Sequence, residues 1–281
     1  HMDRSGYKGA ELNPAVDLLP LLGCGKEPGT FRKLIAEAAG GREEHLLSTE
    51  LFLYPRTKAV QTGLNGEFIV SPRLDDLQCV FGCLEGFLAA KPGGSLPVLA
   101  VFNNEEVGSN TRQGADSTFL TDVLERIAHG CGLDSEGWKA AVANSFMVSA
   151  DNAHAIHPAH PEYADKGEFP VLGGGIVIKY NANQRYTTDA VSGAVFQAIC
   201  QEAGVPVQRY SNRADLPGGS TLGNISTAHL SVPTVDIGLP QLAMHSVCET
   251  AGAADTDYLV KAMTAYFSRD FHRDRDGGIV F

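Results

Sequence analysis

The chain has 281 residues, of which 43% are apolar and 20% are charged, a composition typical of a globular protein with a sizeable core. The net charge of -11 argues against a nucleic-acid-binding surface, which would be rich in Lys and Arg. No apolar run approaches the roughly 20 residues of a membrane-spanning helix, and the start has no signal-peptide pattern. The six cysteines are scattered without a CxxC pair, so we expect a reducing, cytoplasmic compartment.

Residues 3–66 mix short apolar pieces with helical and extended ones. The apolar spacing predicts a helix within 31–40, and the alternation in "STELFLYP" predicts a strand over 48–55. Asn65-Gly66 predicts a tight turn between two extended segments.

From residue 71 onward, apolar strands alternate with amphipathic helices. The spacing predicts helices over 72–90, 116–129, 189–203 and 256–268. The predicted strands cover 97–103, 145–150, 175–181, 205–211 and 232–238. This alternation indicates an α/β fold with a mixed, largely parallel sheet that is covered on both faces. Ligands of such folds bind beyond the carboxyl ends of the strands.

Acidic residues and a histidine are predicted at this edge of the sheet. They follow predicted strands or begin the helix 72–90, and they are Asp75, Asp76, Glu105, Glu106, Asp151 and His245. Close carboxylates repel each other and resist desolvation, and a divalent cation removes that cost. Aspartate, glutamate and histidine together suit zinc or a similar ion. In an adjacent Glu-Glu pair, one side chain can bind metal while the other acts as a general base.

Each of these residues also has a purely structural interpretation. Asp75 or Asp76 could favour a helix N-terminus through the helix dipole. Asp151 could belong to a turn, and the glutamates and His245 could lie in solvated loops. The metal hypothesis therefore depends on the residues converging in space.

Six stretches carry a specific resemblance, and in chain order they are "PRLDDL", "NNEEVGS", "SADNAHAIHP", "IKYNANQRY", "DLPGGSTLGNIS" and "VDIGLPQLAMHS". Over roughly residues 45–270 the chain resembles the M18 metalloaminopeptidases, the aspartyl aminopeptidase family. The resemblance implies a three-layer zinc-peptidase fold with an inserted dimerisation domain. It also implies removal of N-terminal residues, often acidic ones, from peptides by attack of a metal-activated water. Family members hold two Zn²⁺ ions per site, with Mn²⁺ or Co²⁺ as alternatives, and usually form homo-oligomeric dodecamers.

The resemblance also implies a role for each matching residue. Asp75 matches the carboxylate that bridges the two metals, and Glu105 matches the general base. Glu106 and His245 match ligands of one metal, and Asp151 matches a ligand of the other.

Further matches concern the substrate. Lys179 and Gly219-Ser220-Thr221 match positions near the substrate side chain, where a cation and hydroxyl or backbone donors would suit an acidic residue. Lys179 could instead be an exposed strand-end lysine, and "PGGST" could be only a turn. His154 is a candidate hydrogen-bond donor beside the metal ligands.

One part of the family pattern is missing. M18 sequences contain an earlier His-x-Asp motif, whose histidine completes the second metal site, and neither His1 nor His45 has an aspartate two positions on. We therefore expect 3–66 to be the C-terminal part of the inserted dimerisation domain and 67–281 to be the catalytic domain without its N-terminal portion. The second metal should then bind weakly or not at all. The alternative hypothesis is a catalytically silent scaffold or oligomer subunit.

Overall fold

The computed structural model describes residues 12–25, 27–216 and 218–281, and it divides into two compact units, His1–Tyr54 and Pro55–Phe281. The first unit contains helix α1 (Thr30–Ala38), which confirms the helix predicted within 31–40, and a short 3₁₀ turn, η2 (Glu43–His45). The strand predicted over 48–55 is wrong. An alternating pattern forms a strand only where a neighbouring backbone pairs with it, and here Phe52 is 73% exposed and the segment has no strand structure.

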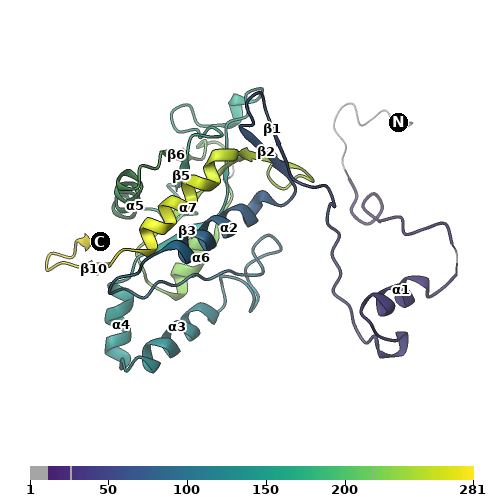
Figure 1. The fold of residues 1–281 in the computed structure, drawn as a ribbon, viewed down its shortest axis with the longest axis horizontal. Coiled ribbons are helices and arrows are strands. Elements are labelled where there is room, and N and C mark those ends of the chain that lie inside the picture. The colour runs from purple at the N-terminus through teal and green to yellow at the C-terminus, as the bar shows by residue number, and fades with distance from the viewer. Residues whose placement is uncertain (1–11, 26, 217) are drawn as a thin grey trace. The chain divides into compact units, whose positions relative to one another are not determined.

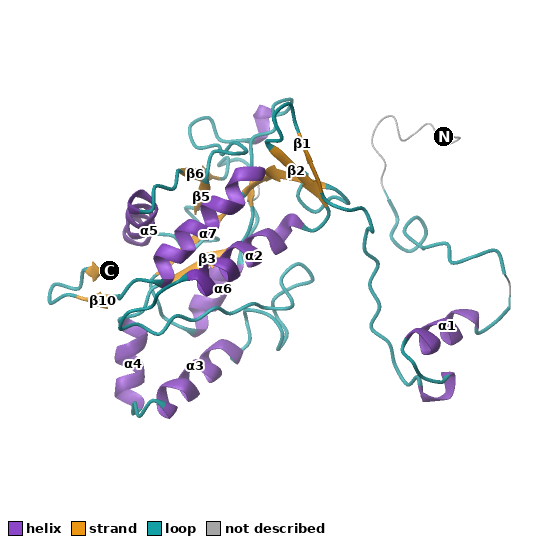
Figure 2. Cartoon of the chain, in the orientation of Figure 1, coloured by secondary structure: helices purple, strands orange, loops and turns teal. Residues whose placement is uncertain are grey.

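The second unit contains the remaining helices and all the strands of the described chain (Figure 1 and Figure 2). Its helices are α2 (Leu74–Ala89), α3 (Phe119–Gly130), α4 (Ser135–Ala143), α5 (Ala190–Glu202), α6 (Leu222–His229), α7 (Ala253–Phe267) and the short 3₁₀ turn η3 (Pro161–Tyr163). The central sheet has the order β3 (Met147–Ala150), β7 (Thr234–Gly238), β5 (Ile176–Tyr180) and β6 (Val207–Ser211). These elements confirm the helices and strands predicted after residue 110.

The central sheet is mixed, as predicted. β3 pairs parallel to β7 and β5 pairs parallel to β6, whereas β5 runs antiparallel to β7. Because β5 is reversed relative to β3, the carboxyl ends of the four strands do not all meet at one edge.

A second sheet was not predicted from the sequence. Its strands, in spatial order, are β1 (Val60–Thr62), β2 (Phe68–Ser71), β9 (Glu249–Gly252), β8 (Pro240–Leu242) and β4 (Ala153–His154). A small hairpin of β10 (His272–Arg273) and β11 (Ile279–Val280) lies near the C-terminus. The β1–β2 hairpin confirms the turn at Asn65-Gly66 and lies wholly in the second unit. The predicted domain boundary at 66/67 therefore falls inside this hairpin, and the assignment of 3–66 to a dimerisation domain stays a prediction, with residues 3–11 outside the described ranges.

Alternation along the central strands gives the sheet two different faces. Val235 and Ile237 of β7 belong to the apolar core formed with α2, α5 and α7. The intervening residue, Asp236, points to the other face, where it accepts a hydrogen bond from Thr221 at the start of α6. Helix α6 packs on β3 and β7. The unit therefore has three layers, with α2, α5 and α7 on one face of the sheet and α6 on the other.

Two glycines allow α2 and α7 to pack closely, and the two helices run side by side (Figure 1). A Cβ atom at Gly82 would lie 2.6 Å from Leu259 Cδ2. A Cβ atom at Gly86 would lie 2.5 Å from Met263 Cβ and 3.0 Å from backbone atoms of α7. This packing fixes the position of α2, whose first turn carries two of the candidate metal ligands.

The strand predicted over 97–103 is also wrong. Residues 97–102 have an extended course and alternate in burial up to residue 100, and Leu99 packs against the core. Within the described chain, however, no neighbouring strand forms a hydrogen-bonded ladder with this segment. Backbone pairing begins only at Asn103 and Asn104, whose N–H groups both donate to the Gln113 carbonyl at 3.2 Å.

Among the helices of the described residues, none has the length and apolar character needed to cross a bilayer.

The close approach of α2 and α7 predicts the effect of Gly86→Ala. The added methyl group would meet backbone atoms that have no room to move, so the variant should lose about 1–3 kcal/mol of unfolding free energy in urea denaturation. Gly130→Ala, at the end of α3, is the matched control because its Cβ would meet nothing within 4 Å. A Gly86→Ala variant as stable as the parent would contradict the packing described here.

Candidate metal centre

Four separate segments bring the predicted acidic residues and histidine together. Asp75 and Asp76 lie at the start of α2, and Glu105 and Glu106 lie in the turn after the extended segment 97–102. Asp151 directly follows β3, and His245 lies in the loop between β8 and β9. The convergence on which the metal hypothesis depends is therefore present in the fold.

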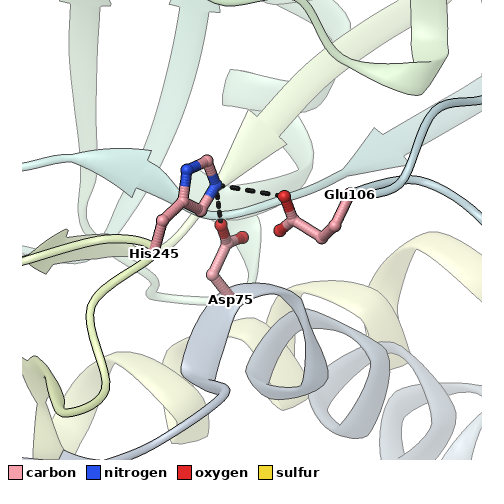
Figure 3. A group of neighbouring side chains, drawn as sticks. All are labelled: Asp75, Glu106 and His245. Carbon is pink, nitrogen blue, oxygen red and sulfur yellow. Dashed lines mark ion pairs between the residues drawn. The ribbon is translucent and has the colours of Figure 1, made fainter. Parts of the chain in front are cut away.

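Asp75, Glu106 and His245 form the first group of candidate ligands. His245 Nε2 lies 3.1 Å from Asp75 Oδ2 and 3.1 Å from Glu106 Oε2, and the three side chains point toward one another (Figure 3). Ligand atoms around a tetrahedral zinc ion with bonds of 2.0–2.2 Å lie about 3.3–3.6 Å apart. The observed spacing is close to that value, so this group fits a divalent cation with three protein ligands.

Asp75, Asp76 and Asp151 form the second group, in which one oxygen of each carboxylate lies within 4.8 Å of the others. Asp75 is thus common to both groups, as expected of a bridging carboxylate. Asp76 was not assigned as a ligand from the sequence, because its position at the start of a helix also has a purely structural interpretation.

The environment of these carboxylates also fits a cation. Asp75 Oδ1 and Asp76 Oδ1 are buried without a hydrogen-bond partner. Burial, followed by repulsion from Asp151 and Glu106, raises the pKa of Asp75 to about 10. Burial and the charge of Asp151 also raise the pKa of Asp76 well above its ordinary value. At neutral pH these groups either retain protons or share a cation.

Glu105 lies beside these groups without belonging to either of them. Burial, with smaller contributions from Asp151 and Glu106, raises the pKa of its carboxyl group to about 7. A carboxylate with this pKa can both accept and release a proton near neutral pH, which is the property needed in a general base.

Lys179 is buried in the structure, so the alternative of an exposed strand-end lysine is excluded. Its side chain is 2% exposed, and Nζ lies 3.6 Å from Asp151 Oδ2 and 5.5 Å from the centre of the Tyr186 ring. Burial lowers the pKa of Lys179, but Asp151 and Asp236 outweigh it and raise the pKa above its ordinary value. The ammonium group therefore offsets part of the negative charge at the site.

The Gly219-Ser220-Thr221 segment, which ends at the N-cap of α6, is connected to the same charges. Thr221 is buried and donates through Oγ1 to Asp236 Oδ1 at 2.9 Å, while Ser220 Oγ donates to Asn224 Oδ1 at 3.1 Å. Asp236 also accepts from the backbone N–H of Thr187 at 2.5 Å. The predicted contacts of Lys179 and this segment with a substrate stay predictions.

His154 lies on β4, where it pairs in register with Gln241 of β8. The residue as a whole is exposed, and its ring centre lies 6.4 Å from that of Tyr210. Within the described chain it joins neither group of candidate ligands. Its predicted role as a donor beside the metal ligands stays a prediction.

Comparison with known sequences identifies relatives of this chain. The family described as "Aminopeptidase I zinc metalloprotease (M18)" matches residues 1–267. A "Probable M18 family aminopeptidase 2" from Clostridium acetobutylicum is 44% identical, over 95% of this chain and 63% of the relative. A protein of the same description from Mycobacterium leprae is 38% identical, over 94% of this chain and 62% of the relative. The chain thus spans about three-fifths of the length of these relatives.

Solved structures give the same answer. A chain from a cryo-EM structure of the Ape4 and Nbr1 complex matches with a TM-score of 0.81 and 33% identity, over 95% of this chain and 56% of that chain. An M18 aminopeptidase from Thermotoga maritima matches with a TM-score of 0.77 and 27% identity, over 89% of this chain and 57% of that chain. A chain of the S. cerevisiae mApe1 dodecamer matches with a TM-score of 0.74 and 28% identity, over 86% of this chain and 56% of that chain. With the family match over nearly its whole length and the three-layer fold, the chain belongs to the M18 family of aminopeptidases.

Proposed function

We propose that this chain is a metal-dependent aminopeptidase that removes N-terminal residues, preferably Asp or Glu, from peptides. The observation that carries the proposal is Asp75, shared by two groups of candidate metal ligands, with Glu105 beside them. The M18 relatives support the reaction class.

The two groups of candidate ligands would form two metal-binding positions. Asp75, Glu106 and His245 would hold one Zn²⁺, and Asp75, Asp76 and Asp151 would hold a second. The second position has only carboxylate ligands, which suit zinc less well than a mixed set with imidazole, so we propose weaker binding there and greater tolerance of Mn²⁺. A bound divalent cation polarises a carbonyl group and lowers the pKa of water.

Glu105 would act as the general base. It lies next to Glu106 in one turn, so the chain places a proton acceptor directly beside a metal ligand. Its raised pKa allows it to take a proton from the attacking water and deliver it to the leaving amine.

The preference for acidic residues is supported by a positive charge and by space. Lys179 remains charged next to Asp151. Ser220 offers a hydroxyl group next to Gly219, and a Cβ atom at Gly219 would meet nothing within 4 Å.

We further propose assembly into a homo-oligomer. This is supported by the dodecamer named for one structural relative and by exposed apolar residues such as Leu64, which is 94% exposed.

The base assignment predicts the behaviour of Glu105→Gln. Because the amide cannot accept the proton, kcat should fall by about 100- to 10,000-fold while the bound metal is retained. Glu136→Gln, at a side chain that is 83% exposed on α4, is the control and should leave both unchanged. Peptidase kinetics with metal analysis would make the test, and full activity of Glu105→Gln would refute the role of this residue.

The raised carboxyl pKa values predict how metal and pH act together. The folded state binds protons more tightly than the unfolded state at Asp75 and Glu105, so the metal-free chain should lose stability as pH rises from 5 to 8. Zn²⁺ or Mn²⁺ should therefore raise the Tm more at pH 8 than at pH 5.5. Thermal unfolding of chelator-treated protein with and without metal measures this, and an equal gain at both pH values would contradict it.

The proposed specificity predicts an order of substrates. Peptides that begin with Asp or Glu should show at least a tenfold higher kcat/KM than the same peptide beginning with Leu, because one hydrogen bond from exposed Ser220 to the substrate carboxylate provides about that discrimination. Kinetics on three peptides that differ only in the first residue would measure it. A faster reaction with the Leu peptide would exclude a preference for acidic residues but would not contradict the proposed metal ligands.

A further inference from the structure

A buried carboxylate links the two segments that supply metal ligands. Glu249, the first residue of β9, is 2% exposed. Its Oε2 accepts a hydrogen bond from the backbone N–H of Asp75 at 3.0 Å, and its Oε1 accepts one from the backbone N–H of His245 at 2.8 Å. One side chain thus binds the main chain of two candidate ligands that lie 170 residues apart in the sequence.

We propose that Glu249 is a positioning residue that holds Asp75 and His245 at the separation a metal ion requires. This inference rests on the metal binding proposed above and adds a residue that no sequence motif singled out. Both carboxylate oxygens already accept from backbone N–H groups, and Glu249 belongs to neither candidate ligand group within the described residues. It therefore acts through Asp75 and His245 and does not touch the metal.

The segment that carries His245 needs such support because its backbone departs from regular structure. His245 has a φ of 66°, in the left-handed region that residues other than glycine rarely adopt, and Ala243 in the same loop has a φ of 57°. Conformations of this kind persist only where the surrounding structure holds them. The hydrogen bond from the His245 backbone N–H to the Glu249 side chain supplies that restraint.

The sheet register fixes Glu249 between the two segments. Its backbone pairs with Ser71, the last residue of β2, and Asp75 follows four residues later. His245 precedes Glu249 by four residues, in the loop that enters β9. Asp75 and His245 therefore each lie four residues from the Ser71–Glu249 pair of the second sheet. From this position the Glu249 side chain binds the backbone of both.

Replacement of Glu249 by glutamine tests the proposal. The amide places a donor where one oxygen now accepts from a backbone N–H, so one of the two restraints is lost without a change of size. Affinity for Zn²⁺ and Mn²⁺ should fall by about 10- to 100-fold, measured by calorimetric titration of metal into the folded, chelator-treated chain. Glu249→Asp, which keeps the charge but shortens the reach, should lose affinity similarly and remains measurable if the glutamine variant does not fold.

The chain supplies a matched control. Asp255, at the start of α7, is also buried and also accepts from two backbone N–H groups, those of Gly173 at 2.8 Å and Gly175 at 2.9 Å. Asp255→Asn should lower thermal stability but leave metal affinity unchanged. The proposal is overturned if metal affinity in Glu249→Gln stays within about twofold of the parent, or if it falls equally in Asp255→Asn.

A second measurement separates this inference from the proposed function. In the metal-free parent, the amide protons of Asp75 and His245 should exchange slowly with solvent, and both should exchange faster in Glu249→Gln but not in Asp255→Asn. If the parent binds no metal, the proposed function fails while this exchange result still tests the restraint. If the parent binds metal and the two amides exchange at the same rate in parent and variant, the role of Glu249 is wrong.

Discussion

The mutual repulsion of buried carboxylates is the constraint around which this protein is organised. Asp75, Asp76 and Asp151 occupy one small volume, and burial with like charges raises the pKa of the first two far above their ordinary values. A fold tolerates such a group if rigid elements hold it together and if the carboxyl groups retain protons or positive charge compensates them. The close packing of α2 on α7 supplies the rigidity, and buried Lys179 supplies part of the charge.

The two faces of the central sheet have different tasks as a result. The face toward α2, α5 and α7 is apolar and provides the core. The face toward α6 carries Lys179 and Asp236, which continue the line of alternating charge that begins at Asp151. Asp236 in turn holds Thr221 and the start of α6. The metal centre is therefore connected to the Gly219-Ser220-Thr221 segment through charges and hydrogen bonds.

The sequence predicts those features that depend on local pattern. Helical spacing located α2, α5 and α7, the position after β3 located Asp151, and the two adjacent acids located the Glu105-Glu106 pair. The strands predicted at 48–55 and 97–103 failed because strand formation requires a partner that periodicity does not reveal. Glu249 was missed for a related reason, and Asp76 was placed at this edge without a ligand role. Both roles come from contacts with residues distant in the sequence, which local spacing does not indicate.

The extended segment 97–102 has a consequence for how the protein behaves in solution. Its residues alternate in burial up to residue 100, as in a strand, and Val98 and Val101 are 41% and 53% exposed. Within the described chain its backbone joins no ladder, so water or another polypeptide must satisfy its N–H and C=O groups. Unpaired backbone groups beside exposed apolar side chains offer a place where another polypeptide can associate. That place lies on a stretch that ends beside the candidate general base.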